Sequence, residues 1–253
     1  MLQTIFTAWL GVILLMCGVW LLFLWQKNAA IIDVFWSIAI TTAAALLSAH
    51  GQHNTTVTLL KVLLFVWMLR LAGYLFIHRV LAGHVDPRYD KISQTWRIPK
   101  SLGFFLNFQF QGILATVIAS PFLFIAQLPA FSLWASIGLA AILSGIAGET
   151  IADWQLQRFK KQRRGPVCNQ GLWRYSRHPN YFFDWLTWLG FAVAACAVPR
   201  GWLSLLSPML LYWIMTRLTG PITERGSIES RGQVYLDYQA KTSMFFPWRR
   251  KKA

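Results

Sequence analysis

The sequence predicts an all-α, polytopic membrane protein with seven transmembrane helices. Three observations support this: 56% of the 253 residues are hydrophobic, only 13% are charged, and long apolar stretches recur along the chain. Soluble domains usually carry about 25% charged residues. The composition therefore excludes an ordinary soluble protein.

Seven apolar stretches define the expected helices, because about 20 helical residues cross the hydrocarbon core of a bilayer. No basic residue precedes the first stretch, so we expect it to remain as a membrane helix and not to act as a cleaved signal peptide. Pro199, Arg200 and Gly201 join the last two stretches and predict a tight hairpin between antiparallel helices. In order, the stretches are 4–25, 29–49, 58–79, 102–127, 131–151, 181–199 and 201–219.

The loops between these stretches differ sharply in charge. Residues 50–57 and 128–130 contain no Lys or Arg, whereas 79–101, 154–180 and the tail after Leu218 are rich in both. Basic loops stay in the cytoplasm, so an odd number of helices predicts an external N-terminus and a cytoplasmic C-terminus. The same rule explains the net charge of +15 without a nucleic-acid partner. No repeat or flexible linker divides the chain, so we expect one domain.

Several polar residues fall inside or at the ends of the expected helices, where charge is costly. Arg70 precedes Arg79 by nine residues, which places it roughly 13 Å deeper in the membrane. A buried arginine needs a partner or water. These residues predict a hydrated cavity open to the cytoplasm. The four carboxylates that share this side of the membrane are Asp33, Glu149, Asp153 and Asp184.

Helical spacing places these polar residues on common faces, since residues four apart are neighbours on a helix. One such pair alone is explained by a polar contact between helices, but several at one depth favour a ligand site. The sets spaced by four are Glu149 and Asp153; Asn180 and Asp184; and Arg70, Tyr74 and His78.

The segment RYSRHPNY (174–181) predicts the start of a helix. Proline is favoured in the first turn, so Pro179 marks the start, and the free N–H groups there attract anions. With Arg174, Arg177 and His178 just ahead, this predicts a phosphate site. An alternative is that basic residues here, Arg163 and Arg164 among them, bind lipid headgroups. No second His or Cys completes a metal site with His178.

Three segments resemble the C-terminal half of the steroid 5-alpha-reductase superfamily, and within it the bacterial DUF1295 branch. They are GETIADWQLQRFKK (148–161), VCNQGLWRYSRHPNYFFDWLTWLGF (167–191) and TERGSIESRGQVYLDYQAKTSMFFPW (223–248). IIDVFW (31–36), WMLRLAGY (67–74) and DPRYDK (86–91) are similar to the N-terminal half of that branch. The resemblance spans most of the chain and implies a bacterial inner-membrane location.

The resemblance implies that residues 145–253 hold NADPH. It also implies reduction of a carbon–carbon double bond conjugated to a carbonyl, in an apolar steroid-like or lipid substrate from the bilayer. Asp237, Tyr238 and Phe246-Pro247 resemble the tail that packs over the cofactor side. By position, Glu149 and Asp153 lie by the adenosine, Lys160 and later bases near phosphate, and Asn180 and Asp184 near the nicotinamide. The full expected set is Arg70, His78, Arg79, Arg88, Glu149, Asp153, Lys160, Arg163, Arg174, Tyr175, Arg177, His178, Asn180, Tyr181 and Asp184.

The expected catalytic residues are Asp33 and Tyr74. Eukaryotic relatives carry an adjacent Gln-Glu pair in helix 2, which this chain lacks, and Asp33 is the only carboxylate near that place. Hydride transfer to the β-carbon of an enone builds charge on the carbonyl oxygen, which a hydrogen-bond donor must stabilise. Tyr74 would donate and Asp33 would orient it. An alternative role for Tyr74 is packing between helices.

Two other functions remain open. Membrane methyltransferases that use S-adenosylmethionine carry a similar Arg-His-Pro-x-Tyr stretch, but their cofactor has no phosphates and needs fewer cations. A non-catalytic lipid-binding or transport protein is the other possibility, although the chain lacks the paired halves with broken helices of many transporters.

Overall fold

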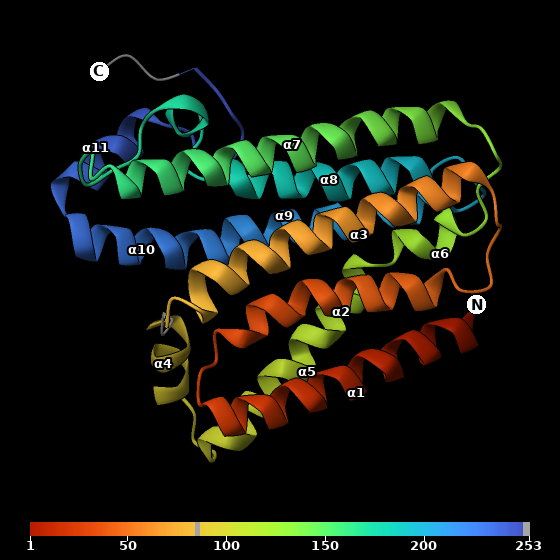
Figure 1. Ribbon diagram of the computed structural model, residues 1–253, viewed down its shortest axis with the longest axis horizontal. Coiled ribbons are helices and arrows are strands. Elements are labelled where there is room, and N and C mark those ends of the chain that lie inside the picture. The colour runs from red at the N-terminus through yellow and green to blue at the C-terminus, as the bar shows by residue number, and fades with distance from the viewer. Residues whose placement is uncertain (84–86, 250–253) are drawn as a thin grey trace. The chain divides into compact units, whose positions relative to one another are not determined.

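The structure is a computed structural model that describes residues 1–83 and 87–249, excluding the side chains of residues 87, 88, 90 and 91 (Figure 1). Within these ranges the regular structure is helical, and the only β-type pairing is a single bridge between Ser176 and Ser243. The prediction of an all-α protein is therefore confirmed. The chain divides into two compact units. Unit 1 comprises Met1–Ser136 and Phe191–Ser207, and unit 2 comprises Ile137–Gly190 and Pro208–Ala253.

Unit 1 is organised around α2 (Ile31–Leu47), which contacts α1 (Leu2–Gln26), α3 (Thr55–Leu75) and α5 (Lys100–Ile118) (Figure 1). The small side chains of Ala39, Ala43 and Ala44 are fully buried in α2, which lets neighbouring helices approach closely. The remaining elements of this unit are the π-helix η1 (Phe76–Val80), α4 (Pro87–Gln94), α6 (Pro121–Ile125) and the 3-10 helix η3 (Gly201–Leu205).

Unit 2 contains most of α7 (Leu133–Lys161) and α8 (Pro179–Ala195), followed by a helical run that changes type twice. This run consists of α9 (Leu206–Trp213), the π-helix η4 (Ile214–Thr219) and α10 (Gly220–Arg231). After α10 come α11 (Gln233–Lys241) and the C-terminal tail, while the short helix η2 (Gly171–Arg174) lies between α7 and α8 in sequence. The expected cofactor-binding half, 145–253, largely coincides with this unit.

Glycines bring α7 and α8 together. A Cβ atom on Gly145 would lie 2.2 Å from Thr187 Oγ1 and 2.7 Å from the Phe183 carbonyl oxygen, and one on Gly148 would lie 2.3 Å from the Phe183 ring. Only the absence of these side chains permits such an approach. The contact fixes the backbone beside Glu149 and Asp184, which follow Gly148 and Phe183 in sequence.

Four helices are long and apolar enough to cross a membrane, and they indicate a membrane protein. They are Leu2–Gln26, Thr55–Val80, Lys100–Ile125 and Leu133–Lys161, and Ile31–Leu47 is a shorter apolar helix. Each of the seven predicted stretches coincides with helix, but this does not confirm a count of seven spans. The end predicted at 151 is wrong: α7 continues ten residues to Lys161, because Arg158, Lys160 and Lys161 in its last turn favour its C-terminus.

The 201–219 stretch also differs from the prediction. It is divided among three helix types and runs on into α10, since hydrophobicity reports neither π-helical turns nor polar continuations. A tight turn is present at 198–201, where the Gly201 N–H donates to the Val198 carbonyl at 2.9 Å.

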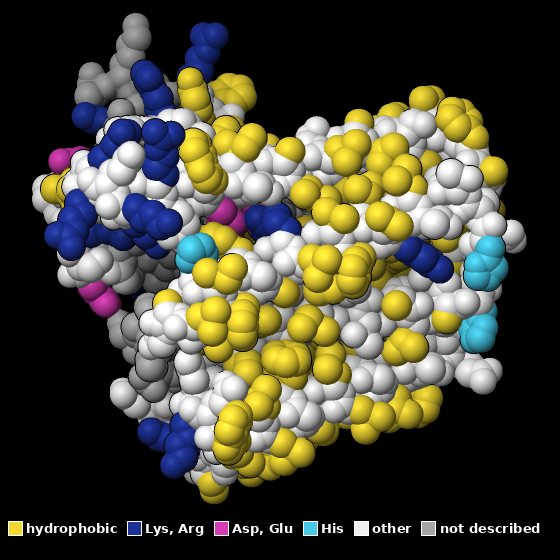
Figure 2. Space-filling model, viewed as in Figure 1, with side chains coloured by type: hydrophobic (Ala, Val, Ile, Leu, Met, Phe, Trp, Pro, Cys, Tyr) yellow, Lys and Arg dark blue, Asp and Glu magenta, His cyan; other side chains and the backbone are white. Residues whose placement is uncertain are grey.

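Unit 2 has a basic surface and an apolar surface, as expected of a protein that lies partly in a membrane. Lys and Arg side chains gather around the end of α7, whereas hydrophobic side chains cover much of the rest of that helix (Figure 2). Leu143, Ile151 and Trp154 are among the exposed hydrophobic residues. A surface of this kind suits a helix that passes from hydrocarbon to headgroups.

The α7–α8 contact provides a stability test. Gly145→Val should lower the free energy of unfolding by about 1–3 kcal/mol, because the new side chain meets backbone as well as Thr187. Thermal unfolding in detergent measures the change. Gly226→Ala is the control, since a Cβ atom at Gly226 in α10 meets nothing within 4 Å. Equal stability of Gly145→Val and the unaltered protein would contradict this packing.

Candidate functional site

The predicted site residues divide between the two units. Unit 1 holds both expected catalytic residues and four expected cofactor residues: Asp33, Tyr74, Arg70, His78, Arg79 and Arg88. Unit 2 holds the others: Glu149, Asp153, Lys160, Arg163, Arg174, Tyr175, Arg177, His178, Asn180, Tyr181 and Asp184.

A buried ion cluster around Glu224 is the best-defined polar feature of unit 2. Arg177 donates through Nε to Glu224 Oε1 at 2.6 Å and through Nη2 to Oε2 at 3.2 Å. His178 Nε2 lies 3.0 Å from Oε1, and Gln239 Nε2 donates to Oε2 at 2.7 Å. The Glu224 side chain is only 9% exposed. Several donors to one carboxylate offset the cost of burying its charge.

The cluster brings together three separate parts of unit 2, which are the segment before α8, α10 and, through Gln239, α11. Arg177 and His178 precede α8, which begins at Pro179 as predicted. Glu224 lies in α10, directly after the π-helix η4. A π-helical turn inserts one residue and rotates the following residues by about 100°. The direction in which Glu224 points therefore depends on η4, a feature that apolar spacing does not report.

The cluster sets the ionisation of Glu224. Burial by itself raises the pKa of this carboxyl, but hydrogen bonds from His178 and Arg177 and their charges outweigh it and lower the pKa to about 2. Nearby, burial and the negative charge of Glu224 raise the pKa of Tyr235 to about 12. Glu224 is thus an anion and Tyr235 a neutral phenol at neutral pH.

Arg177 uses its remaining donors within the protein as well. Its Nη1 donates to the carbonyl oxygens of Gln239 at 3.1 Å and Thr242 at 2.6 Å. The phosphate role expected for Arg177 and His178 stays a prediction, but in the structure both side chains bind Glu224. Sequence reasoning missed Glu224, although it lies in the third segment that carried the family resemblance.

The C-terminal tail holds the segment before α8. The Arg177 N–H donates to the Ser243 carbonyl at 2.8 Å, and the Trp248 N–H donates to the Tyr175 carbonyl at 3.0 Å. Ser176 Oγ donates to the Phe245 carbonyl at 2.8 Å, and the Tyr238 hydroxyl donates to the Trp173 carbonyl. The tail motif seen in the sequence therefore packs against residues 173–177.

The same segment is also anchored to α7. Trp173 Nε1 donates to the Ala152 carbonyl at 2.9 Å, and the Leu172 N–H donates to Gln155 Oε1 at 2.9 Å. Both acceptors lie within two residues of Asp153. Residues 172–178 are consequently fixed on one side by α7 and on another by the tail.

Buried carboxylates lie on the two glycine-packed helices. Glu149 and Asp153 on α7 and Asp184 on α8 are each at most 6% exposed. Asn180 Oδ1 on α8 is buried, and no hydrogen-bond partner for it exists among the described residues. A buried carbonyl oxygen without a donor costs about 1–3 kcal/mol. A bound group with an N–H or O–H would remove this cost.

The other predicted residues of unit 2 lie nearer the surface. Lys160, Arg163 and Arg174 are exposed, and Lys and Arg side chains surround this end of the unit (Figure 2). The Tyr181 ring stacks on His178, with centroids 5.0 Å apart and planes 11° apart. Tyr181 thus supports the ion cluster, whereas Tyr175 is 43% exposed.

A second cluster lies in unit 1 around Asp33. Arg79, in the π-helix η1, forms an ion pair with Asp33 Oδ2, and the Tyr89 hydroxyl donates to Asp33 Oδ1 at 2.7 Å. Tyr89 is 9% exposed. Sequence reasoning missed Tyr89, although it lies in DPRYDK, a segment already noted for its resemblance.

The spacing of polar residues along α3 and η1 gives one observed contact. The Tyr74 and His78 rings meet edge to face with centroids 4.7 Å apart, as their spacing by four predicts. Arg70, one turn before Tyr74, is half-buried. The Arg88 side chain lies outside the described residues.

Comparisons with known proteins give a family but no activity. The family model described as "Protein of unknown function (DUF1295)" matches residues 19–242. An "Uncharacterized protein C594.04c" from Schizosaccharomyces pombe is 26% identical over 264 residues, covering 90% of this chain and 75% of the yeast protein. No solved structure matches.

The Glu224 cluster makes stability depend on pH. A carboxyl whose pKa is lower in the folded state stabilises the protein above its unfolded pKa, near 4.5, and this contribution is lost as pH falls toward about 2. Glu224→Gln should remove this dependence and destabilise the protein at pH 7 by about 3 kcal/mol, because Arg177 stays buried without its anion. Unfolding measured from pH 7 to pH 3 tests both effects.

The matched control is Glu229→Gln, an exposed carboxylate in the same helix, which should change stability by less than about 0.5 kcal/mol. If Glu224→Gln and Glu229→Gln gave the same stability at every pH, the Glu224 cluster would neither stabilise the fold nor cause its dependence on pH.

Proposed function

We propose that this chain, which belongs to the DUF1295 family of proteins of unknown function, is a membrane-embedded reductase that uses NADPH. It reduces a carbon–carbon double bond conjugated to a carbonyl in an apolar lipid or steroid-like substrate from the bilayer. The resemblance of its motifs to the steroid 5-alpha-reductase superfamily motivates the reaction class. The proposal includes an inner-membrane location, with the basic C-terminal tail in the cytoplasm and the N-terminus outside.

The buried side-chain carbonyl of Asn180 is the observation that supports the cofactor proposal most strongly. Asn180 Oδ1 has no hydrogen-bond donor among the described residues, and the nicotinamide of NADPH carries a carboxamide N–H that fits it. Asp184 follows one turn later on α8 and is buried, and its carboxylate suits a ribose hydroxyl. When bound, NADPH would supply the hydride.

The carboxylates of α7 suit the other end of the cofactor. Glu149 and Asp153 are buried, and their oxygens accept hydrogen bonds from hydroxyl and amino groups such as those of adenosine. The exposed bases that follow, Lys160 and Arg163, suit the phosphates. The 2′-phosphate favours NADPH over NADH, and the same cations give S-adenosylmethionine, which has no phosphate, no advantage.

Unit 1 offers the acid that the reaction requires. Charge on the substrate oxygen needs a positioned donor. Tyr89 is a candidate beside Tyr74: its single hydroxyl proton is donated to Asp33, which also pairs with Arg79, and this proton would turn from Asp33 to the substrate oxygen when substrate binds. Asp33 would hold the Tyr89 hydroxyl in place before substrate binds, a positioning role like the one first expected for it toward Tyr74.

An NADPH-oxidation assay with a panel of apolar enones tests the proposal. Tyr89→Phe should lower kcat about 100-fold, because it removes only the hydroxyl that stabilises charge. Asp184→Asn keeps the size of the side chain and should raise the KM for NADPH about tenfold, because it removes one charge-assisted hydrogen bond.

Tyr212→Phe is the control, since no hydrogen bond from the Tyr212 hydroxyl contributes to either cluster, and it should retain the full rate. The reductase assignment would be rejected if Tyr89→Phe and Asp184→Asn both retained the rate and KM of the unaltered protein.

A further inference from the structure

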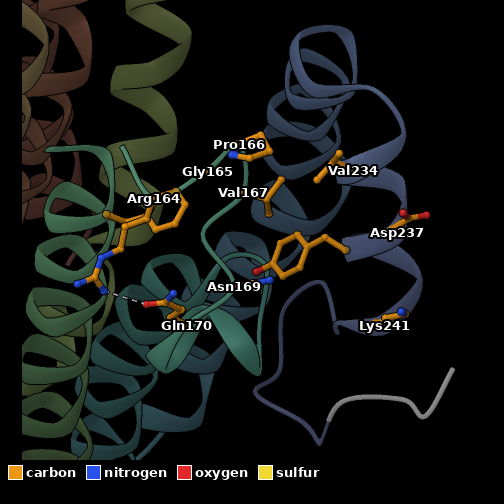
Figure 3. Close-up of a pocket in the computed structure, with 11 residues that line it drawn as sticks. Arg164, Gly165, Pro166, Val167, Asn169, Gln170, Val234, Asp237 and Lys241 are labelled. Atoms are coloured by element: carbon orange, nitrogen blue, oxygen red, sulfur yellow. Dashed lines mark hydrogen bonds between the residues drawn. The ribbon is translucent and has the colours of Figure 1, made fainter. Parts of the chain in front are cut away.

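Unit 2 contains a pocket that the proposed reaction does not use. It has a volume of about 310 Å³ and lies between the segment after α7 and one face of α11 (Figure 3). Val234, Asp237, Tyr238 and Lys241 contribute from α11, and their spacing of three and four residues places them on a single side of that helix. A pocket of this volume fits a small headgroup rather than a whole dinucleotide.

The lining combines an apolar wall with cations and amides. Phe159, Val167 and Val234 supply apolar surface, whereas Arg164 and Lys241 supply two positive charges from opposite sides of the pocket (Figure 3). Among the described residues, the exposed Arg164 guanidinium donates one long hydrogen bond, of 3.3 Å, to Gln170 Oε1. It can therefore turn toward an anion without breaking a buried interaction.

Other polar groups of the lining suit hydroxyls. Asn169 and Gln170 carry amides that both donate and accept. Asp237 is an acceptor whose Oδ1 already receives a bond from Gln233 Nε2 at 2.9 Å. The charges of Arg164 and Lys241 exceed that of Asp237, so the lining favours a ligand with one net negative charge that also carries hydroxyl groups.

The position of the pocket along α7 matches the level of lipid headgroups. Trp154 is 57% exposed, and the Arg158 guanidinium lies over its ring at 5.2 Å. Tryptophan paired with a cation is typical of the boundary between hydrocarbon and headgroups. The lining begins at Phe159, one residue after Arg158, and so lies just beyond that boundary.

We propose that this pocket binds a phosphate diester or monoester that carries hydroxyl groups, as in the headgroup of phosphatidylglycerol. Arg164 and Lys241 hold the phosphate, Asp237 accepts from the hydroxyls, the two amides accept from or donate to them, and the apolar wall contacts the adjoining carbons. The pocket uses none of the residues that we propose for the reductase, and binding there does not require that activity.

The test measures binding to the full-length protein in detergent after removal of lipid, by native mass spectrometry and by thermal stabilisation. Phosphatidylglycerol should bind, whereas diacylglycerol, which lacks phosphate, should not. The double variant Arg164→Gln/Lys241→Gln should weaken binding at least about tenfold, since each cation near a membrane surface contributes about a threefold to tenfold gain. Arg225→Gln/Arg249→Gln removes the same charge outside the pocket and should bind as the unaltered protein does.

A parallel titration with glycerol 3-phosphate and inorganic phosphate shows whether the ligand is a lipid headgroup or a soluble phosphate ester. Competition by glycerol 3-phosphate at a concentration similar to that of the lipid would identify a soluble phosphate ester as the ligand, whereas its failure to compete would identify a lipid. The proposal is overturned if the pocket variant binds phosphatidylglycerol as tightly as the control variant, or if diacylglycerol binds equally well.

Discussion

The buried carboxylate of Glu224 is the interaction on which the arrangement of unit 2 depends. It accepts from Arg177 and Gln239 and contacts His178, so one side chain of α10 joins the segment before α8 to α11. The carbonyls of Gln239 and Thr242 occupy a further donor of Arg177. Removing Glu224 would leave the Arg177 guanidinium buried without its anion, and removing Arg177 would take two hydrogen bonds from the buried Glu224 carboxylate.

The Glu224 cluster changes which anion the segment before α8 is seen to bind. Arginine and histidine ahead of a helix N-terminus suggest an anion site, yet here the protein itself supplies the anion. The groups proposed for a nucleotide are the buried side-chain carbonyl of Asn180, the carboxylates of Glu149, Asp153 and Asp184, and the exposed bases Lys160 and Arg163. Recognition of a nucleotide would then combine buried polar contacts on α7 and α8 with phosphate contacts at the surface, while the Glu224 cluster keeps the backbone between them in place.

Much of the fold follows from the sequence, because a helix that lies in a membrane must be a long run of apolar residues. Apolar length located the four helices that are long enough to cross a membrane, and Pro179 located the start of α8. The sequence does not indicate which polar residues pair over long distances: Glu224 lies 46 residues from His178, and Tyr89 lies 56 residues from Asp33. The π-helices η1 and η4 could not be predicted either, since a one-residue insertion changes the direction of the following side chains without changing the composition of the helix. The polar spacing across α3 and η1 did predict that Tyr74 and His78 share a face, and their rings are in contact.

Binding of cofactors to the purified, detergent-solubilised protein tests the central claim most directly. Calorimetric titration with NADPH, NADH and S-adenosylmethionine should give the tightest binding for NADPH, with NADH weaker by about tenfold or more because it lacks the 2′-phosphate. Added salt should reduce that difference. Preferential binding of S-adenosylmethionine, or equal binding of NADPH and NADH at low salt, would contradict the account.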